Sequence, residues 1–143
     1  MIVARSNSSG VLVPAHGGQL RGHRSAIPLE VRKEIARRTD WRCSYCGCEL
    51  NNRSLVIDHV YPVHRGGTNS IDNLTAACRS CNHYKNTFTV DQFRYHIGKW
   101  VARLERDSVQ FRNALRFGLI KIDHYPGESV EFYAEKIGVW KRP

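Results

Sequence analysis

The sequence predicts a small α+β fold with a core of two short strands and a helix, flanking helices and a C-terminal β-hairpin. Two Cys-x-x-Cys pairs, Cys43/Cys46 and Cys78/Cys81, enclose most of this core. Each pair can place two thiolates on one side of a tight turn, so that together they complete a tetrahedral sulfur site for zinc. The metal ion would close the loop between the pairs and hold the small scaffold together.

A short helix is predicted for residues 28–38. Pro28 stands at its start, and two arginines lie in its last turn, where the helix dipole favours cations. Its buried stripe would combine Ile35 with either Leu29 or Val31.

Between the cysteine pairs the predicted order is strand, long loop, strand, helix. Residues 54–57 form a short apolar, β-branched run, which is typical of a strand, and this strand ends at Asp58-His59. The glycine pair 66–67 forces an irregular loop. Residues 73–77 would form the second strand, and residues 79–86 would form a helix that begins at the second cysteine pair.

Beyond the second pair, Thr89 and Gln92 have the spacing of a helix capping box. The apolar residues that follow at helical spacing are Val90, Phe93, Ile97, Trp100, Val101 and Leu104. Gly118 indicates a helix end. Residues 120–122 and 130–134 alternate between apolar and polar on either side of a Pro-Gly turn, which predicts the terminal hairpin.

The chain divides into three predicted regions. Residues 1–26 contain three arginines and no acidic residue, which predicts a flexible basic arm, either a plain tail or an arm that contacts DNA. Residues 27–88 form the predicted core, and residues 89–143 form an extension of helix and hairpin.

The composition favours a polyanionic partner. The chain carries 22 Lys+Arg against 13 Asp+Glu, a formal net charge of +9, which suits nucleic acid first and an anionic membrane surface second. Five cysteines, four of them in two short pairs, favour metal over disulfides. The first residues contain no sustained apolar segment of a signal peptide or membrane span, so we expect no membrane association and a cytoplasmic, reducing location.

A zinc module alone does not account for the Asp58-His59 doublet. A structural zinc site needs only four ligands and turns, and a single histidine more often lies on a surface or in a core than acts as a base. Neighbouring strand residues point to opposite faces, however, so Asp58 can hold a hard metal ion while His59 addresses a water molecule.

The segments DHVYP, GG, SIDNL and CRSCNHYK, framed by CSYC, resemble the HNH endonuclease family in its zinc-stabilised ββα-metal form. The resemblance is close over residues 43–88 and looser over residues 28–42. It implies that Asp58 is the first ligand of a catalytic metal ion and that His59 is the general base. It also implies that Asn73 either orients the histidine or ties down the loop.

The last position of the motif has two interpretations. Asn82 occupies the place of the family's final histidine, so this sequence reads H-N-N, but His83 is adjacent. Consecutive helix residues differ in direction by about 100°, and therefore both cannot face Asp58. Asn82 is the preferred metal ligand because its spacing from Cys81 fits and Lys85 lies one turn further on.

The resemblance implies metal-dependent hydrolysis of phosphodiester bonds in DNA. His59 would take a proton from the attacking water, and a divalent ion on Asp58 and Asn82 would stabilise charge on the leaving oxygen. One carboxylate and one amide ligand suit Mg²⁺ or Mn²⁺, which leaves zinc to the sulfur site. The alternative, from another class, is a non-catalytic zinc module that binds nucleic acid.

The candidates for DNA contact are Lys85, Arg65 and, in the arm, Arg5, Arg21 and Arg24. Lys85 would either neutralise a phosphate or stay solvated on its short helix. Arg65 lies in the loop before the glycine pair, where it would either contact DNA or face water. The oligomeric state does not follow from the sequence.

Overall fold

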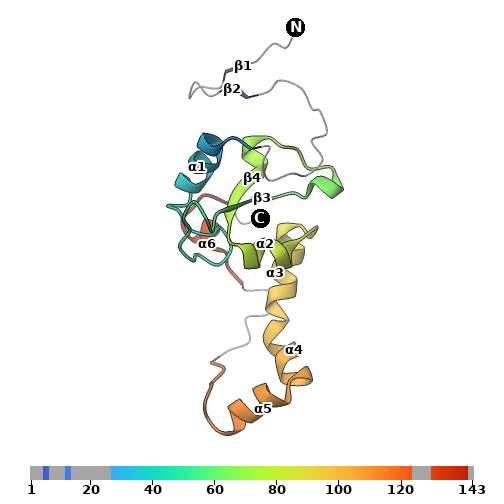
Figure 1. Ribbon diagram of the computed structural model, residues 1–143. Coiled ribbons are helices and arrows are strands. Elements are labelled where there is room, and N and C mark those ends of the chain that lie inside the picture. Colours follow the sequence, from blue (N-terminus) through green and yellow to red (C-terminus); the bar gives the residue numbers. More distant parts are fainter. Residues whose placement is uncertain (1–4, 7–11, 14–26, 124–129, 142–143) are drawn as a thin grey trace.

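An antiparallel pair of strands, β3 (Val56–His59) and β4 (Leu74–Ala77), lies at the centre of the fold (Figure 1). The two strands pair along their whole length, with Asp58 opposite Thr75. All of β4 is buried, whereas β3 alternates between buried and half-buried residues, so one of its faces is directed outward. The structure is a computed structural model, which describes residues 5–6, 12–13, 27–123 and 130–141.

Two helices cover this pair of strands. α1 (Leu29–Arg37) packs against β4, and α2 (Arg79–Lys85) packs against β3. The buried stripe of α1 contains Val31 and Ile35, while Leu29 is 56% exposed. Val31 is therefore the partner of Ile35 in the core.

The predicted long loop between the strands is confirmed, and it contains two short 3₁₀ helices, η2 (Val63–Arg65) and η3 (Ile71–Asn73). Gly66 ends η2 in a left-handed conformation, with φ at 93°, which glycine adopts without steric cost. Gly67 has no room for a side chain, because a Cβ there would lie 2.0 Å from the carbonyl oxygen of Tyr61. Both glycines are thus required by the path of the loop.

The first cysteine pair lies on a tight turn formed by residues 42–49. The backbone N–H of Cys43 donates to the carbonyl oxygen of Cys48 at 2.9 Å, and Arg42 and Glu49 form an isolated antiparallel bridge. We refer to residues 42–49 as the cysteine turn.

Tyr45, inside the cysteine turn, lies at the centre of an aromatic cluster. Its ring meets those of Phe93, Phe132 and Trp140 edge to face, at centroid distances of 5.4, 5.3 and 5.4 Å. Pairs of this geometry contribute about 0.5–1.5 kcal/mol each beyond the area they bury. The core is therefore assembled from segments that are far apart in the sequence.

Three further helices follow α2, namely α3 (Val90–Gly98), α4 (Trp100–Asp107) and α5 (Val109–Arg116). The predicted capping box of α3 is confirmed. Thr89 N–H donates to Gln92 Oε1 at 3.1 Å, and Gln92 N–H donates to Thr89 Oγ1 at 3.3 Å.

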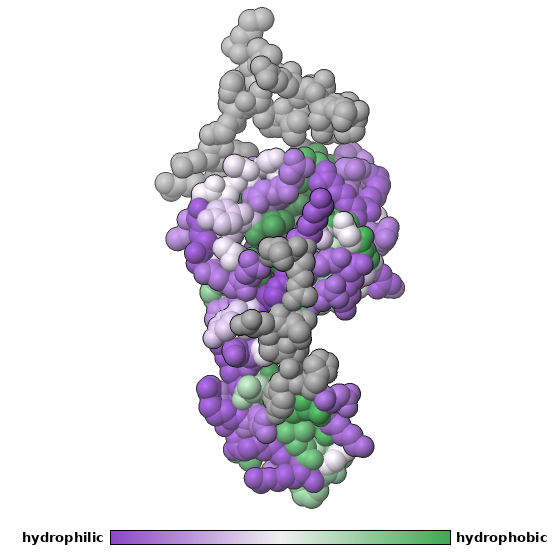
Figure 2. Space-filling model, turned by 180° about the vertical axis from the view of Figure 1, so that it is seen from behind, coloured by the Kyte–Doolittle hydropathy of each residue, from purple (hydrophilic) through white to green (hydrophobic). Residues whose placement is uncertain are grey.

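The apolar face predicted as continuous is divided between α3 and α4. Phe93 of α3 is 1% exposed, whereas Trp100 and Leu104 of α4 are 37% and 47% exposed. In Figure 1, α4 and α5 extend away from the strands, and Figure 2 shows apolar surface gathered on that lobe. Only the α3 part of the stripe therefore belongs fully to the core.

The predicted C-terminal β-hairpin is not formed. Among the described residues of this region, 120–123 and 130–132 contain no strand, and Tyr133–Lys136 form the short helix α6. The turn expected between the two arms falls in residues 124–129, outside the described residues.

The last segment docks on the cysteine turn instead of pairing with a neighbouring strand. The backbone N–H groups of Tyr133 and Ala134 donate to the carbonyl oxygens of Tyr45 and Ser44, at 3.1 and 2.9 Å. Phe132 is buried in the aromatic cluster. The alternating apolar pattern thus indicates that one side of the segment is buried against the core. A docked segment produces this pattern as well as a strand does.

An ion pair fastens this segment to α3. Arg94 Nη1 donates to Glu135 Oε2 at 2.9 Å and Nη2 donates to Oε1, and the hydrogen bonds to Glu135 raise the pKa of Arg94. The guanidinium also donates to the carbonyl oxygen of Val130 and lies 4.7 Å from the ring centre of Phe132. The packed core therefore continues past residue 88, where the sequence places the end of the core region.

In the N-terminal region the structure describes one small ladder, β1 (Arg5–Ser6) antiparallel to β2 (Leu12–Val13). Arg21 and Arg24 lie outside the described residues, so the flexible basic arm over residues 1–26 stays a prediction. None of the helices in the described ranges is long and apolar enough to cross a membrane.

Replacing Arg94 by Met should lower the free energy of unfolding by about 3–5 kcal/mol, because it leaves the Glu135 carboxylate buried without this cation. Urea unfolding followed by circular dichroism measures the change. The double variant Arg94→Met/Glu135→Leu should lie closer to the wild type, since it removes the buried charge together with its partner. A loss below about 1 kcal/mol for the single variant, which is the range of exposed ion pairs, would show that this ion pair does not hold the segment on α3.

Candidate active site and cysteine cluster

Two turns bring four cysteines together. The Sγ atoms of Cys43, Cys46, Cys78 and Cys81 all lie within 4.8 Å of one another, and the Cys46 and Cys78 sulfurs are 3.9 Å apart. In a tetrahedral site with Zn–S bonds of about 2.3 Å, neighbouring sulfurs stand about 3.8 Å apart. Donor type and spacing therefore fit one zinc ion. Cys48 is exposed and does not belong to the cluster.

Hydrogen bonds between the thiols of the cluster shift their pKa values. The Cys81 thiol donates a hydrogen bond to the Cys43 sulfur, which lowers the pKa of Cys43 to about 5. The same hydrogen bond, together with burial, raises the pKa of Cys81. Four thiolates at this spacing repel one another unless a cation offsets their charge, so the loss of their protons is coupled to metal binding.

Asp58 has one carboxylate oxygen fixed by two neighbours. Its Oδ2 accepts a hydrogen bond from the Tyr45 hydroxyl at 2.6 Å and pairs with Lys85 Nζ at 3.0 Å. Burial and the adjacent Asp58 carboxylate raise the pKa of Tyr45 well above its ordinary value, so the hydroxyl remains a donor. Oδ1 makes no hydrogen bond to a described residue, and no buried side-chain oxygen in the described ranges lacks a partner. Oδ1 is therefore accessible from the surface.

Lys85 is fully buried, which corrects the expectation that it meets a phosphate or solvent. Its Nζ donates to the backbone carbonyl oxygen of His59 at 2.7 Å and pairs with Asp58. The correction has a physical reason, because the packing of α2 on β3 buries a carboxylate that needs a cation beside it. Lys85 thus stabilises the end of β3.

His59 points to the opposite face of β3 from Asp58 and is half-buried. Its ring Nε2 lies 2.8 Å from Oδ1 of Asn69, in the loop after the glycine pair. Sequence reasoning missed Asn69, and also missed Tyr45 as a partner of Asp58. The available signals were a short amide side chain just after a glycine turn and a tyrosine between two metal-spaced cysteines.

Asn73 ties down the loop. Its Oδ1 accepts from the N–H of Tyr61 at 2.8 Å, and its Nδ2 donates to the carbonyl oxygens of Tyr61 and Thr68 at 3.0 and 2.8 Å. Within the described ranges no hydrogen bond joins it to the His59 ring. Of the two implied roles, the geometry favours that of a residue positioning the loop.

α2 presents Asn82 and Lys85 on one face, because the two residues are three positions apart. Asn82 is half-buried, whereas His83 is exposed and meets the Tyr84 ring at a centroid distance of 5.5 Å. Since Lys85 contacts Asp58, Asn82 shares the helix face that packs against β3. The geometry therefore favours Asn82 over His83 as the partner of Asp58.

Of the remaining candidates for DNA contact, the structure describes Arg65 and Arg5. Arg65 is exposed in η2, and its Nε donates to the carbonyl oxygen of Thr87 at 2.9 Å. Arg5 lies in β1, and Arg21 and Arg24 are outside the described residues. Contact of these residues with DNA stays a prediction.

Comparison with known proteins places the site in a family context. Residues 43–97 match a family model described as HNH endonuclease. The CRISPR-associated endonuclease Cas9 of Corynebacterium diphtheriae is 34% identical over 55 residues, which are 38% of this chain and 5% of that protein. The crystal structure of the Type II-C Cas9 enzyme from Actinomyces naeslundii aligns with a TM-score of 0.44 and 20% identity, over 60% of this chain and 12% of that chain. This chain therefore spans only a small part of the length of either protein.

Replacing Lys85 by Met should lower the free energy of unfolding by about 3–5 kcal/mol, because the Asp58 carboxylate is left buried without a cation. Lys33→Met is the matched control, since Lys33 forms an exposed ion pair with Glu30 whose loss costs about 1 kcal/mol at most. Chemical denaturation of both variants measures the difference. Equal losses for the two would show that the Lys85 pair is not a structural requirement.

Proposed function

Residues 43–97 belong to the HNH endonuclease family, and from this premise we propose that the chain is a metal-dependent DNA endonuclease. His59 acts as the general base, and Asp58 and Asn82 hold the catalytic divalent ion. The observation that carries the proposal is the end of β3, where an acid with one accessible oxygen and a half-buried histidine follow each other on opposite faces. A zinc module that only binds nucleic acid requires neither.

The hydrogen bond of His59 supports its role as a base. The amide oxygen of Asn69 accepts, so the neutral ring carries its proton on Nε2 and donates it there. Nδ1 is then unprotonated and takes a proton from the attacking water. Asn69 thus positions the ring and sets its tautomer.

The residues present fit a divalent cation. Asp58 Oδ1 and the side-chain oxygen of Asn82 are hard donors of the kind that Mg²⁺ and Mn²⁺ prefer. A bound ion of this type stabilises negative charge on the leaving oxygen. Tyr45 and Lys85 both hold Oδ2, which keeps Oδ1 available for the ion.

The geometry of the cysteine cluster supports a structural zinc ion that fixes both sides of the site. Tyr45, which orients Asp58, lies between the first two cysteines, and Asn82 follows Cys81 directly. A zinc ion held by these four cysteines would fix the segments that carry the two oxygen ligands, and it would take no part in the reaction.

The proposal that DNA is the substrate rests on the family match and on the net charge of the chain. The formal net charge is +9, and four thiolates with one Zn²⁺ change it by −2, which leaves an excess of about +7. Such an excess attracts the phosphate backbone. Arg65 and the three arginines of the predicted arm contribute to this charge.

Purified protein should cleave supercoiled plasmid in the presence of Mg²⁺, and His59→Ala should slow cleavage by about 10²–10⁴-fold because it removes the proton acceptor. Gel electrophoresis of the plasmid forms over time measures the rate. His64→Ala, which changes an exposed histidine in the loop that follows β3, should cut at the wild-type rate.

The same assay separates the two candidates on α2, because Asn82→Ala should raise the Mg²⁺ requirement by about tenfold or more and His83→Ala should not. If His59→Ala cleaves plasmid at the wild-type rate, the assignment of His59 as the base is wrong. A wild type that binds DNA and never cuts it would favour the non-catalytic zinc module.

Freshly purified protein should contain one zinc per chain, and Cys43→Ser should unfold the central region, since structural zinc contributes on the order of 10 kcal/mol to the folding of small modules. Mass spectrometry of the metal content and circular dichroism measure both effects. Cys48→Ser is the matched control and should keep its zinc. Folded protein without zinc would contradict the assignment.

A further inference from the structure

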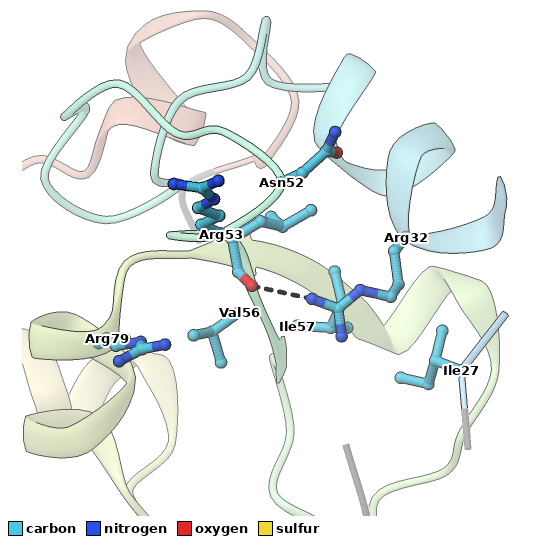
Figure 3. A pocket seen from close by; sticks show the side chains of 8 residues that line it. Ile27, Arg32, Asn52, Arg53, Val56, Ile57 and Arg79 are labelled. Carbon is cyan, nitrogen blue, oxygen red and sulfur yellow. Dashed lines mark hydrogen bonds between the residues drawn. The ribbon is translucent and has the colours of Figure 1, made fainter. Parts of the chain in front are cut away.

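A hollow of about 150 Å³ lies against the first half of β3 (Figure 3). Its base includes Val56 and Ile57 of the strand. Arg32 of α1, Arg53 of the turn before β3 and Arg79 of α2 line its sides, so three separate segments each contribute an arginine. In the view of Figure 3, Arg32 and Arg79 lie on opposite sides of Val56.

The hollow is cationic, and no acidic side chain among the described residues lines it. Arg53 and Arg79 are exposed and form no ion pair with a described residue. Arg32 is half-buried, and its Nη2 donates to the carbonyl oxygen of Leu55 at 2.9 Å, which orients its guanidinium toward the strand. Like charges placed together destabilise the folded state unless an anion offsets them, so the arrangement favours an anionic ligand.

The size of the hollow narrows the class of ligand. Sites for small molecules usually measure about 300–1,000 Å³, whereas a water molecule takes about 30 Å³ in the liquid. A volume of about 150 Å³ therefore admits a single anionic group better than a whole cofactor. Guanidinium groups are planar, permanently charged and bind phosphate through two parallel hydrogen bonds.

The hollow lies at the start of β3, where its lining includes Val56, which points the same way as Asp58, and Ile57, which points the same way as the proposed base His59. Ile57 and His59 are two positions apart, so their side chains point in the same direction, about 7 Å apart along the strand. The lining also includes Arg53, six positions before His59, so along an extended chain the hollow reaches to about 20 Å from His59. DNA advances about 3.4 Å per nucleotide along its axis, so a phosphate in the hollow lies about two to six nucleotides from one at His59.

The geometry points to a phosphate subsite in which Arg32, Arg53 and Arg79 bind a backbone phosphate of the DNA strand that His59 cleaves. The inference rests on the proposed nuclease function and deepens it, since it places the substrate strand along β3. The subsite contributes binding energy that the substrate and the transition state share, and so it sets KM.

The test compares Arg53→Gln/Arg79→Gln with the matched double variant Arg116→Gln/Lys121→Gln. Both remove two exposed positive charges, but the second pair lies at the end of α5 and just after it, away from β3. Binding to a short fluorescein-labelled DNA duplex is measured by anisotropy over a range of salt concentrations, with Ca²⁺ in place of Mg²⁺. Zinc content and circular dichroism confirm that each variant is folded.

The subsite variant should bind about tenfold or more weakly than the control, and its plot of log K against log salt should be flatter by about 0.9, the contribution of one phosphate contact. On plasmid with Mg²⁺ it should raise KM and leave kcat unchanged. If the wild type cleaves plasmid but both double variants have the same affinity, salt slope and KM, the subsite is wrong and the proposed nuclease function is unaffected. Absence of cleavage by the wild type would overturn the nuclease, and the binding comparison would still decide the subsite.

Discussion

The buried contact among Asp58, Lys85 and Tyr45 is the interaction on which the rest of the structure depends. One carboxylate oxygen joins the cysteine turn, β3 and α2, because it accepts from the tyrosine hydroxyl and pairs with the lysine. A carboxylate taken out of water requires such partners. The ring of Tyr45 also packs on Phe93 and Phe132, so a single side chain connects the polar site to the apolar core.

The C-terminal segment completes this core from a distance. Phe132 fills the aromatic cluster, and the backbone after it bonds to the cysteine turn. The ion pair between Arg94 and Glu135 holds the segment in place, with side chains 9% and 4% exposed. A chain of this size buries limited apolar surface, and the cysteine cluster and the C-terminal segment both add to what the strands and helices bury.

The two faces of β3 each carry one residue of the proposed site, Asp58 on one and His59 on the other. Asp58 is buried, with Oδ2 held by Tyr45 and Lys85, while His59 on the opposite face is half-buried. The arginine-lined hollow lies at the start of this short strand, and the proposed base lies at its end. An open face with a positive rim is the kind of surface that accommodates a nucleic-acid backbone.

The sequence by itself determined the features that depend on local spacing: the two cysteine pairs, the Asp58-His59 doublet, the loop glycines and the capping box at Thr89. These patterns report on neighbours within a few residues, and that is the range over which turns and helix ends are decided. Only the tertiary structure decided that Lys85 is buried, that Phe132 docks instead of joining a hairpin and that Asn69 meets His59. Lys85 lies 26 positions from its acceptor at His59, and Arg94 lies 41 from Glu135. In the sequence, a buried lysine looks the same as an exposed one, and an apolar alternation looks the same in a strand as in a docked segment. The difference lies in the partner, which depends on the surfaces that packing brings together.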